Sequence, residues 1–463
     1  MLQTIETINT AVNNFIWGVP AMVCIIGVGL YLSLRTRFLQ IRKFPYAIRT
    51  TIGRMFRKKN ASDGAITPFQ AVCTALAATV GTGNIAGVAG AIAIGGPGAV
   101  FWMWVSALFG MCTKYAEVTL AVHYREINAN GELVGGPMYY IKNGLSKKWH
   151  WLAYLFAAFG VLTVFGTGNA TQVNTITTAI NSALLNYNVI SESAVSTSNL
   201  IIGIIIAILI AMILLGGIKR IGHVTEKLVP FMALVYIAGS LIVILCNITR
   251  LPSAVAQIFL GAFNPSAVLG GAAGVTVKEA IRYGVARGLF SNEAGMGSTP
   301  HAHARAVVKN PHCQGLAAMI SVFIDTFIVL NLTVFSILTT NSLSSGKDGI
   351  MLTQYAFSTV FGSFGDIFIA VCLLFFAFST ILGWHFFGSI NVKHLFGKKG
   401  MVPYSVLVAV FIVVGSMLKV DLVWTLADFF NGLMVIPNAL ALLALSGVVA
   451  SICKKYSSEK SDN

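Results

Sequence analysis

Two short segments far apart in the chain share one pattern: a small residue, Asn, any residue, Ala and Gly. They read Gly-Asn-Ile-Ala-Gly at 83–87 and Ser-Asn-Glu-Ala-Gly at 291–295, and further glycines lie close to each. Glycines clustered within an apolar segment favour a break in a helix, which frees backbone N–H and C=O groups. In lipid such groups are tolerated where they line a cavity or meet a ligand. The paired segments therefore predict a ligand site built from two broken helices.

Close packing of helices through small residues is the alternative for either segment. Two breaks at matched positions favour the ligand site, because this is the pattern of transporters built from inverted repeats. A third glycine-rich segment, Gly-Thr-Gly-Asn at 166–169, repeats residues 81–84. It has no counterpart in the other half of the chain, and we interpret it as a packing contact.

Motifs of soluble enzymes are weak or absent. Residues 81–86 fit G-x-G-x-x-G/A, but no strand is predicted before them and no acidic residue follows at about 20 residues, so a dinucleotide site is not expected. His301 and His303 have no carboxylate or thiolate at metal-ligand spacing, and we expect them on an exposed inner loop. The sequence has no H-E-x-x-H, G-x-S-x-G or Walker motif. We therefore do not expect an enzyme.

The composition is that of a membrane protein. Of the 463 residues, 10% are charged and 56% are hydrophobic, and the mean hydropathy is +0.79, whereas soluble domains carry about 25% charged residues. An all-α integral membrane protein with many spans in a lipid bilayer is predicted. The net charge of +15 comes from short gaps between apolar runs, unlike the basic face of a nucleic-acid binder. Neither a nucleic acid nor an obligate protein partner is expected.

Eleven runs are predicted to cross the bilayer, for which about 20 apolar residues are needed. The run at 276–300 carries several charged residues, and we count it because the loss of this span would scramble the distribution of positive charge between the two sides. The runs are 13–34, 68–94, 99–124, 149–185, 199–217, 228–247, 276–300, 314–340, 365–388, 402–418 and 424–447.

The positive charges predict the orientation. With the N-terminus outside, 24 of the 31 Lys and Arg residues fall in the inner gaps and the C-terminal tail. The outer gaps hold Arg250, Lys347 and Lys419. Because positive residues gather on the cytoplasmic side, we expect the N-terminus outside and the C-terminus in the cytoplasm, in the plasma (inner) membrane.

In this topology the two breaks lie in runs of opposite direction. The chain then divides into two five-helix halves, a 5+5 inverted repeat, with one extra helix at the front. The predicted parts are an extra N-terminal helix and basic loop at 1–67, a first repeat at 68–247, an extracellular connection at 248–275, a second repeat at 276–447 and a cytoplasmic tail at 448–463.

Four strings resemble the sodium:alanine symporter family, the alanine or glycine:cation symporters, and the resemblance extends over almost the whole chain. The strings are GGPGAVFWMWVSALFG at 95–110, FSNEAGMGSTP at 290–300, VGTGNIAG at 80–87 and FAFSTILGW at 376–384. The resemblance implies a leucine-transporter-type fold with one extra N-terminal helix. It also implies a secondary symporter that takes up alanine or glycine with sodium.

A small amino acid is a zwitterion, and a broken helix can offer free N–H groups to its carboxylate and unwound carbonyls to its ammonium. We expect the N–H groups near Thr82 and Gly83 to hold the carboxylate, with Asn84 bracing the break. The groups expected to receive the ammonium are the carbonyls near Thr79, Gly288 and Phe290 and the Ser291 hydroxyl.

The fold that the chain resembles places one sodium ion between the first broken helix and the eighth helix of the repeat core. Carried onto this sequence, its ligands are the carbonyls of Ala77, Val80 and Phe376 and the hydroxyls of Ser379 and Thr380. All five are neutral oxygens, the ligand type that hard cations prefer. Hydrogen bonding of the two hydroxyls within their own helix is the alternative.

Substrate size and coupling ion leave alternatives open. Trp384 lies four residues after Thr380 on the same helix face, where a bulky indole favours a small substrate, and Gln172 adds either a substrate contact or a packing hydrogen bond. The alternatives are a symporter for glutamine or another larger neutral amino acid, a proton-coupled symporter and, less favoured, a membrane-embedded enzyme or a channel. The acidic residues in or beside spans are Glu117, Glu226, Glu293, Asp325 and Asp428, and Glu293 is the favoured proton carrier because it follows Asn292 at the second break.

Overall fold

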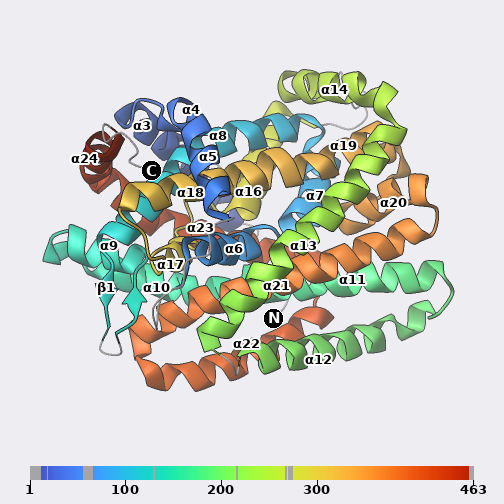
Figure 1. Cartoon of the computed structure of the whole chain (residues 1–463). Helices are drawn as coiled ribbons and strands as arrows, with labels where there is room; N and C mark the ends of the chain where they lie inside the picture. Colours follow the sequence, from blue (N-terminus) through green and yellow to red (C-terminus); the bar gives the residue numbers. More distant parts are fainter. Residues whose placement is uncertain are drawn as a thin grey trace.

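The computed structural model describes residues 12–17, 19–55, 66–128, 131–214, 217–265, 268 and 275–457. They form a bundle of long helices with one two-stranded antiparallel hairpin, β1 (Glu126–Ile127) and β2 (Leu133–Val134), at one end (Figure 1). The predicted all-α class is confirmed.

The N-terminal segment forms the extra helix and then turns along one end of the bundle. Its first part matches the expected span at 13–34, and α3 packs against α8. Two further helices, α4 and α5, occupy part of the gap that the sequence analysis left without structure. The elements are α2 (Val19–Met22), η1 (Val23–Gly27), α3 (Val28–Arg35), α4 (Leu39–Arg42) and α5 (Phe44–Met55).

The first half of the bundle contains the first broken helix. Its initial part begins with a capping box between Thr67 and Gln70 and with Pro68 at the first helical position, both strong start signals. The elements are α6 (Pro68–Thr79), η2 (Gly83–Gly87), α7 (Val88–Gly95), α8 (Gly98–His123), α9 (Pro137–Gly144), η3 (Lys147–Trp149), α10 (Trp151–Thr163), η4 (Val164–Ala170), α11 (Thr171–Asn186), η5 (Glu192–Ala194), α12 (Val195–Leu214) and α13 (Gly217–Cys246).

The second half contains the second broken helix, α16 followed by α17. Two helices, α14 and α20, lie in gaps where no helix was expected, and α14 runs across one end of the bundle (Figure 1). The elements are η6 (Ile248–Arg250), α14 (Leu251–Phe263), α16 (Val277–Asn292), α17 (Pro300–His303), α18 (Pro311–Phe323), η7 (Ile324–Leu330), α19 (Asn331–Thr339), η8 (Ser342–Ser345), α20 (Gly349–Phe361), α21 (Phe364–Phe396), η9 (Lys398–Gly400), α22 (Met401–Met417), α23 (Val420–Ala444) and α24 (Ser446–Ser457).

Within the described residues, seven helices are long and apolar enough to cross a membrane, or eight if the bent pair Pro68–Thr79 and Gly83–Gly95 is one span. The expected total of eleven stays a prediction. Length and apolar composition do not identify α8 or α16 as spans. Helix α8 contains the buried charged residues Lys114 and Glu117, and α16 has 16 residues and carries Lys278, Glu279 and two arginines.

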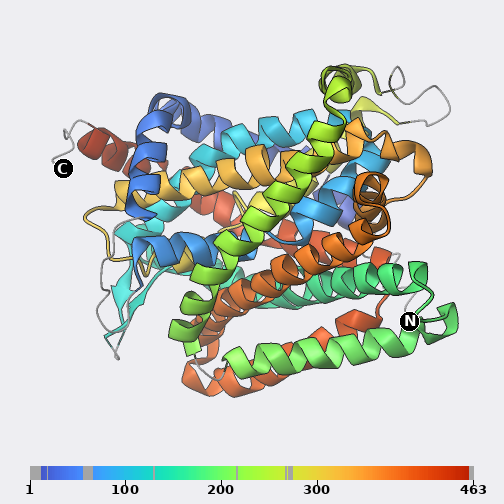
Figure 2. The same ribbon diagram turned by 45° about the vertical axis from the view of Figure 1, so that its right-hand side comes forward.

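The packing brings the two broken helices together in opposite directions. The first part of one lies against the last part of the other, since α6 contacts α17 and α7 contacts α16. Helix α8 packs against α16 and α18, and α21 packs against α6, α10 and α11. Helices α12 and α22 lie side by side at one edge (Figure 2). In the most apolar stretch of Glu192–Leu214, which contains α12, only 22% of the residues are buried. That edge suits contact with lipid.

Candidate functional site

The first break lies at Val80 and Gly81, between α6 and η2, and bends the helix by 46°. Asn84 braces it as predicted, because its Oδ1 accepts the Gly81 N–H at 3.1 Å. Gln172 of α11 accepts the Thr82 N–H at 3.3 Å. A Cβ at Gly81 would lie 2.3 Å from Thr380 Oγ1, so glycine allows the break to contact α21 directly.

The second break runs from Glu293 to Thr299 and needs backbone conformations that favour glycine. Glu293 has φ 54°, Gly295 φ 102° and Gly297 φ 75°, all in the region where a side chain is disfavoured. Asn292 begins the turn by accepting the Ala294 N–H at 3.0 Å. Both breaks predicted from the repeated pattern are therefore present.

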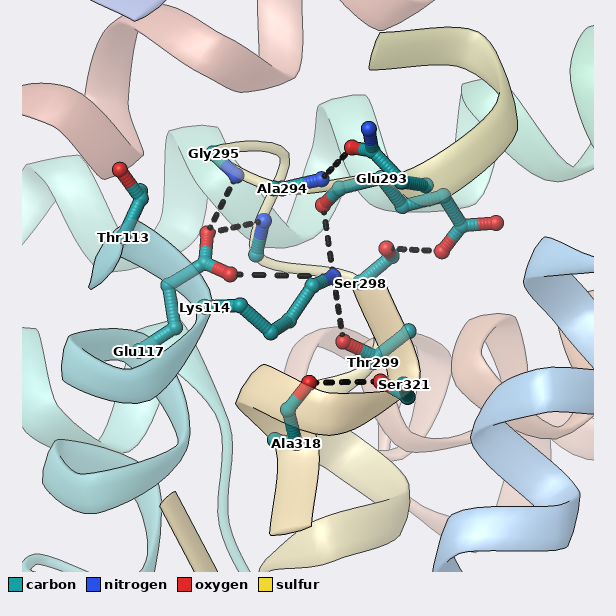
Figure 3. Close-up of polar contacts among 12 residues, drawn as sticks. Thr113, Lys114, Glu117, Glu293, Ala294, Gly295, Ser298, Thr299, Ala318 and Ser321 are labelled. Carbon is teal, nitrogen blue, oxygen red and sulfur yellow. Dashed lines mark hydrogen bonds and ion pairs between the residues drawn. The ribbon is translucent and has the colours of Figure 1, made fainter. Parts of the chain in front are cut away.

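A buried ion pair from α8 holds the second break open (Figure 3). Lys114 Nζ donates to the Glu293 carbonyl and to Thr299 Oγ1, both at 2.8 Å, and lies 3.9 Å from Glu117 Oε2. Glu117 Oε1 accepts the N–H groups of Gly295 at 3.1 Å and Gly297 at 2.9 Å. These two charges supply the partners that unwound backbone groups need.

The Glu293 side chain takes little part in this network. Its carboxylate accepts a short hydrogen bond from Ser298, and Lys114 contacts its carbonyl instead. Asn438 of α23 adds support, because its Nδ2 donates to Glu117 Oε1 at 2.6 Å and to the Gly295 carbonyl at 2.8 Å. The ion pair of Lys114 is thus with Glu117 on the same helix.

Asp325 of η7 connects the two breaks. Its Oδ1 accepts from Asn84 Nδ2 at 2.8 Å, and its Oδ2 accepts from Ser291 Oγ at 2.8 Å. Thr326 also donates to Oδ2 at 3.1 Å and accepts from Asn292 at 3.1 Å. One buried carboxylate is therefore hydrogen-bonded to both broken helices.

Four of the five predicted sodium ligands converge between α6 and α21. Ser379 Oγ lies 3.2 Å from the Ala77 carbonyl oxygen and 2.8 Å from that of Phe376. Thr380 Oγ1 lies 3.0 Å and 3.1 Å from the same two oxygens. Val80 is the C-cap of α6, and the printed sequence places it three residues after Ala77. Both hydroxyls therefore donate to the Phe376 carbonyl within their own helix, the alternative considered for the sequence, and they also reach the Ala77 carbonyl. Neutral oxygens are the ligand type that hard cations prefer, and the sodium ligands stay a prediction.

The predicted substrate residues separate into two groups. Gly83 packs against Phe290 and Ser291, since a Cβ there would lie 3.0 Å from Phe290 Cδ1, and the Thr82 hydroxyl is buried with no hydrogen-bond partner among the described residues. Gly288 instead faces Met103 of α8, 3.5 Å from its Cα when a Cβ is added. The structure therefore groups Gly83, Phe290 and Ser291 and turns Gly288 toward α8.

Thr79 and Trp384 are both buried. The Thr79 hydroxyl donates to the Leu76 carbonyl at 3.4 Å within its own helix. Trp384 is buried and packs on η4, where a Cβ at Gly168 would lie 2.5 Å from its Cβ. In the same turn Thr167 donates to Asn431 at 2.7 Å, and the interpretation of 166–169 as a packing contact stays a prediction.

A cavity of about 480 Å³ lies beyond the first break, at the α7 end. Trp424 lines it and packs against Phe290, with ring centroids 4.9 Å apart. Arg287 and Asp428, also lining it, form a two-bond ion pair with Nη2 to Oδ2 at 3.0 Å. Arg287 stacks on the Trp424 ring at 4.8 Å. Phe290, which packs on both Trp424 and Gly83, connects the cavity wall to the first break.

The two histidines of α17 are not on an exposed loop. His301 and His303 are both fully buried; His301 lies between the rings of Phe156 and Phe387, and His303 Nδ1 is 2.8 Å from Gln314 Nε2. The prediction failed because α17 is the buried second part of a broken helix. No group of three or more His, Cys, Asp or Glu side chains that could hold a metal ion occurs among the described residues.

Known proteins are similar to this chain over nearly its whole length. The profile of the sodium:alanine symporter family matches residues 2–463. The sodium/alanine symporter AgcS of Methanococcus maripaludis is 42% identical over 463 residues, covering 98% of both chains. The probable sodium/glutamine symporter GlnT of Bacillus subtilis is 39% identical over 463 residues, covering 99% of this chain and 92% of that protein.

The fold has a counterpart among solved structures. The crystal structure of MhsT in complex with L-phenylalanine superposes with a TM-score of 0.57 at 14% sequence identity, covering 86% of this chain and 98% of that one. At this identity the likeness concerns the fold alone, and it confirms the predicted leucine-transporter-type architecture.

Proposed function

This chain belongs to the sodium:alanine symporter family, and on that premise we propose that it couples inward sodium flow to uptake of alanine or glycine by alternating access. It is a multi-pass membrane transporter and not an enzyme. One observation carries the proposal: Gly81 of the first break lies against both Gln172 and Thr380. The oxygen cluster for the ion and the backbone for the substrate therefore share one contact.

The substrate site is proposed between the two breaks. The N–H groups of Thr82 and Gly83 would donate hydrogen bonds to the carboxylate. The Thr82 N–H, which donates to Gln172 in this structure, would then be shared between Gln172 and the substrate or released by Gln172. The carbonyls near Thr79 and Phe290 and the Ser291 oxygen would receive the ammonium. Asp325 supports this polarity, because its carboxylate lies 2.8 Å from Ser291 Oγ. Gly288 is the weakest member of the set, since it faces α8.

The small size of the substrate is proposed from the aromatic side chains around the breaks. Phe290 packs directly against Gly83, and Trp384 lies on α21 one turn after Thr380. Both side chains are buried, which leaves little room for a long substrate side chain. The alternative is glutamine or another larger neutral amino acid, because the relatives include both an alanine and a probable glutamine symporter.

Sodium is the proposed coupling ion, held by Ala77, Val80, Phe376, Ser379 and Thr380. Moving one positive charge down about 100 mV releases about 2.3 kcal/mol, enough for roughly 40-fold accumulation at about 1.4 kcal/mol per tenfold. A proton is the second candidate for the coupling ion, and Asp325 is a better candidate than Glu293 to carry it. The Asp325 carboxylate contacts both breaks, whereas that of Glu293 meets Ser298.

The orientation and the repeat boundaries are part of the same proposal. We place the N-terminus outside and the C-terminus in the cytoplasm, with the repeats at 68–247 and 276–447. The antiparallel contacts of α6 with α17 and of α7 with α16 support an inverted relation of the two halves.

Uptake of labelled alanine into proteoliposomes tests the proposal, with a sodium, lithium or proton gradient imposed in turn. Uptake that requires sodium and is inhibited by excess glycine is expected. Uptake driven by protons alone would remove the sodium proposal and move attention to Asp325. If excess glutamine but not glycine competes with alanine, the small-substrate proposal is wrong.

A further inference from the structure

Both broken helices are joined at the α6 end of the molecule. Ile66, just before α6, forms a parallel bridge with Ala306, just after α17. Its N–H donates to the Arg305 carbonyl and its carbonyl accepts from the Val307 N–H, both at 3.3 Å. Ile66, Ala306 and Ala71 of α6 form a small buried cluster behind this bridge. The first part of one broken helix is thus tied to the last part of the other.

The β1–β2 hairpin holds the bridged segment through two arginines. Arg125, at the end of α8, donates from Nη1 to the Ala304 carbonyl at 3.1 Å and to the Ala306 carbonyl at 2.7 Å. Arg305 Nη2 pairs with Glu132 of the hairpin at 3.3 Å. The chain leaves β2 through Gly135, which lies against Ala304 with no room for a side chain.

The charge on Glu132 is favoured where it lies. Burial raises the pKa of this carboxyl, but the hydrogen bond from Asn128 and the positive charges of Arg305 and Lys393 outweigh burial, and the net pKa is below its usual value. The carboxylate is therefore charged at neutral pH. The Arg305 side chain is 3% exposed and that of Glu132 is 30% exposed, so the pair sits where the buried end of the bundle meets solvent.

The two ends of the molecule differ in a way that alternating access requires. The 480 Å³ cavity lies at the α7 end, while at the α6 end the bridge and Arg125 join α6, α8 and the segment after α17. For release at the α6 end, α6 and α17 must separate, which breaks the Ile66–Ala306 bridge. We propose that Arg125, Arg305 and Glu132 form a latch beside β1 and β2, as positioning residues that hold α6 to α17 until the site opens at this end.

This inference rests on the proposed function for its purpose, because only a transporter that opens at both ends needs such a latch. Its test needs no substrate. The reporter is Ala71→Cys in a variant whose seven native cysteines are replaced by serine or alanine. Ala71 is fully buried in the cluster behind the bridge. In nanodiscs both faces are open to a polar thiol reagent, so the rate of labelling reports opening of the latch in either orientation.

Glu132→Gln removes the charge that pairs with Arg305, and Arg125→Lys independently weakens the grip on the two carbonyls. Each is expected to accelerate labelling of the Ala71→Cys reporter at least about fivefold. The matched control is Glu126→Gln, which breaks an ion pair of the same hairpin, with Lys142 at 3.6 Å, without touching α17. It should leave the rate unchanged.

A second readout separates a latch from simple destabilisation. The variants should keep the unfolding temperature of the Glu126→Gln control while labelling faster, because only the balance between conformations shifts. Equal labelling rates for Glu132→Gln, Arg125→Lys and Glu126→Gln would overturn the latch, even if alanine transport is observed. Conversely, faster labelling without alanine transport would keep the latch and overturn the proposed substrate.

Discussion

Gly81 occupies the point where the first break, Gln172 and Thr380 meet. Any side chain there would collide with the Thr380 hydroxyl, since a Cβ would lie 2.3 Å from its oxygen. Gly81→Ala is expected to lower sodium-dependent uptake by at least about tenfold, by displacing an ion ligand at a cost of about 1.4 kcal/mol or more. Gly90→Ala in the same broken helix meets open space and should retain uptake. Similar rates for the two variants in proteoliposomes would contradict the shared contact.

The two hydroxyls of α21 allow a matched pair of substitutions. Ser379 donates to Phe376 within its helix and also reaches the Ala77 carbonyl, whereas Ser389 donates to Phe386 within the same helix at 2.7 Å. Ser379→Ala should raise the sodium concentration for half-maximal uptake by about tenfold, about 1.4 kcal/mol of binding. Ser389→Ala should leave it unchanged. The idea fails if sodium titrations of the two variants coincide.

At this scale the sequence predicted a partner that lies close by in the chain, because Asn84 accepts the Gly81 N–H of its own break. Ser379 and Thr380 were placed by the family resemblance, and both reach the Ala77 carbonyl, but their role as sodium ligands stays a prediction. The pair of Arg287 with Asp428 was one of several possible ion pairs and could not be chosen from the sequence, because 141 residues separate the two and no local spacing indicates the partner. The link from Asp325 to both breaks was missed for the same reason.

The second broken helix depends on charges supplied by its neighbour α8. Lys114→Met would leave Glu117 buried without its cation and would free the Glu293 carbonyl and Thr299. Removing one partner of a buried pair costs about 3–5 kcal/mol, so the unfolding temperature in detergent should fall markedly. Lys142→Met breaks an exposed pair with Glu126 and should cost about 0–1 kcal/mol. Equal unfolding temperatures would show that Lys114 does not support the break.

Elements were predicted well where hydropathy marks them. The long run at 149–185 is one continuous set of helices, α10 to α11, and the breaks fall at the two glycine-rich segments. Helices α14 and α20 were missed because each is 13 residues long, too short to register as a span. His301 and His303 were misplaced because a four-residue helix after a break has no periodic pattern to reveal its burial.

At the scale of the whole molecule, the cavity lies at the α7 end and the proposed latch at the α6 end. The predicted orientation in the membrane can be tested by labelling from one side. In intact cells, a membrane-impermeant thiol reagent should label Lys347→Cys, in an exposed loop beside α20, and should spare Ser451→Cys, exposed on α24. The reason is that the predicted topology places the first outside and the second in the cytoplasm. Both variants are made in the cysteine-free chain, with permeabilised cells as the control for reactivity. Labelling of Ser451→Cys alone in intact cells would invert the topology.

The central claim is that alanine and sodium cross together because their sites share the Gly81–Thr380 contact. The direct measurement is entry of radioactive sodium into proteoliposomes when unlabelled alanine is added outside. Alanine should accelerate sodium entry through the wild-type protein and should fail to do so through Thr380→Ala. Accumulation of alanine with no accompanying sodium entry would contradict the account.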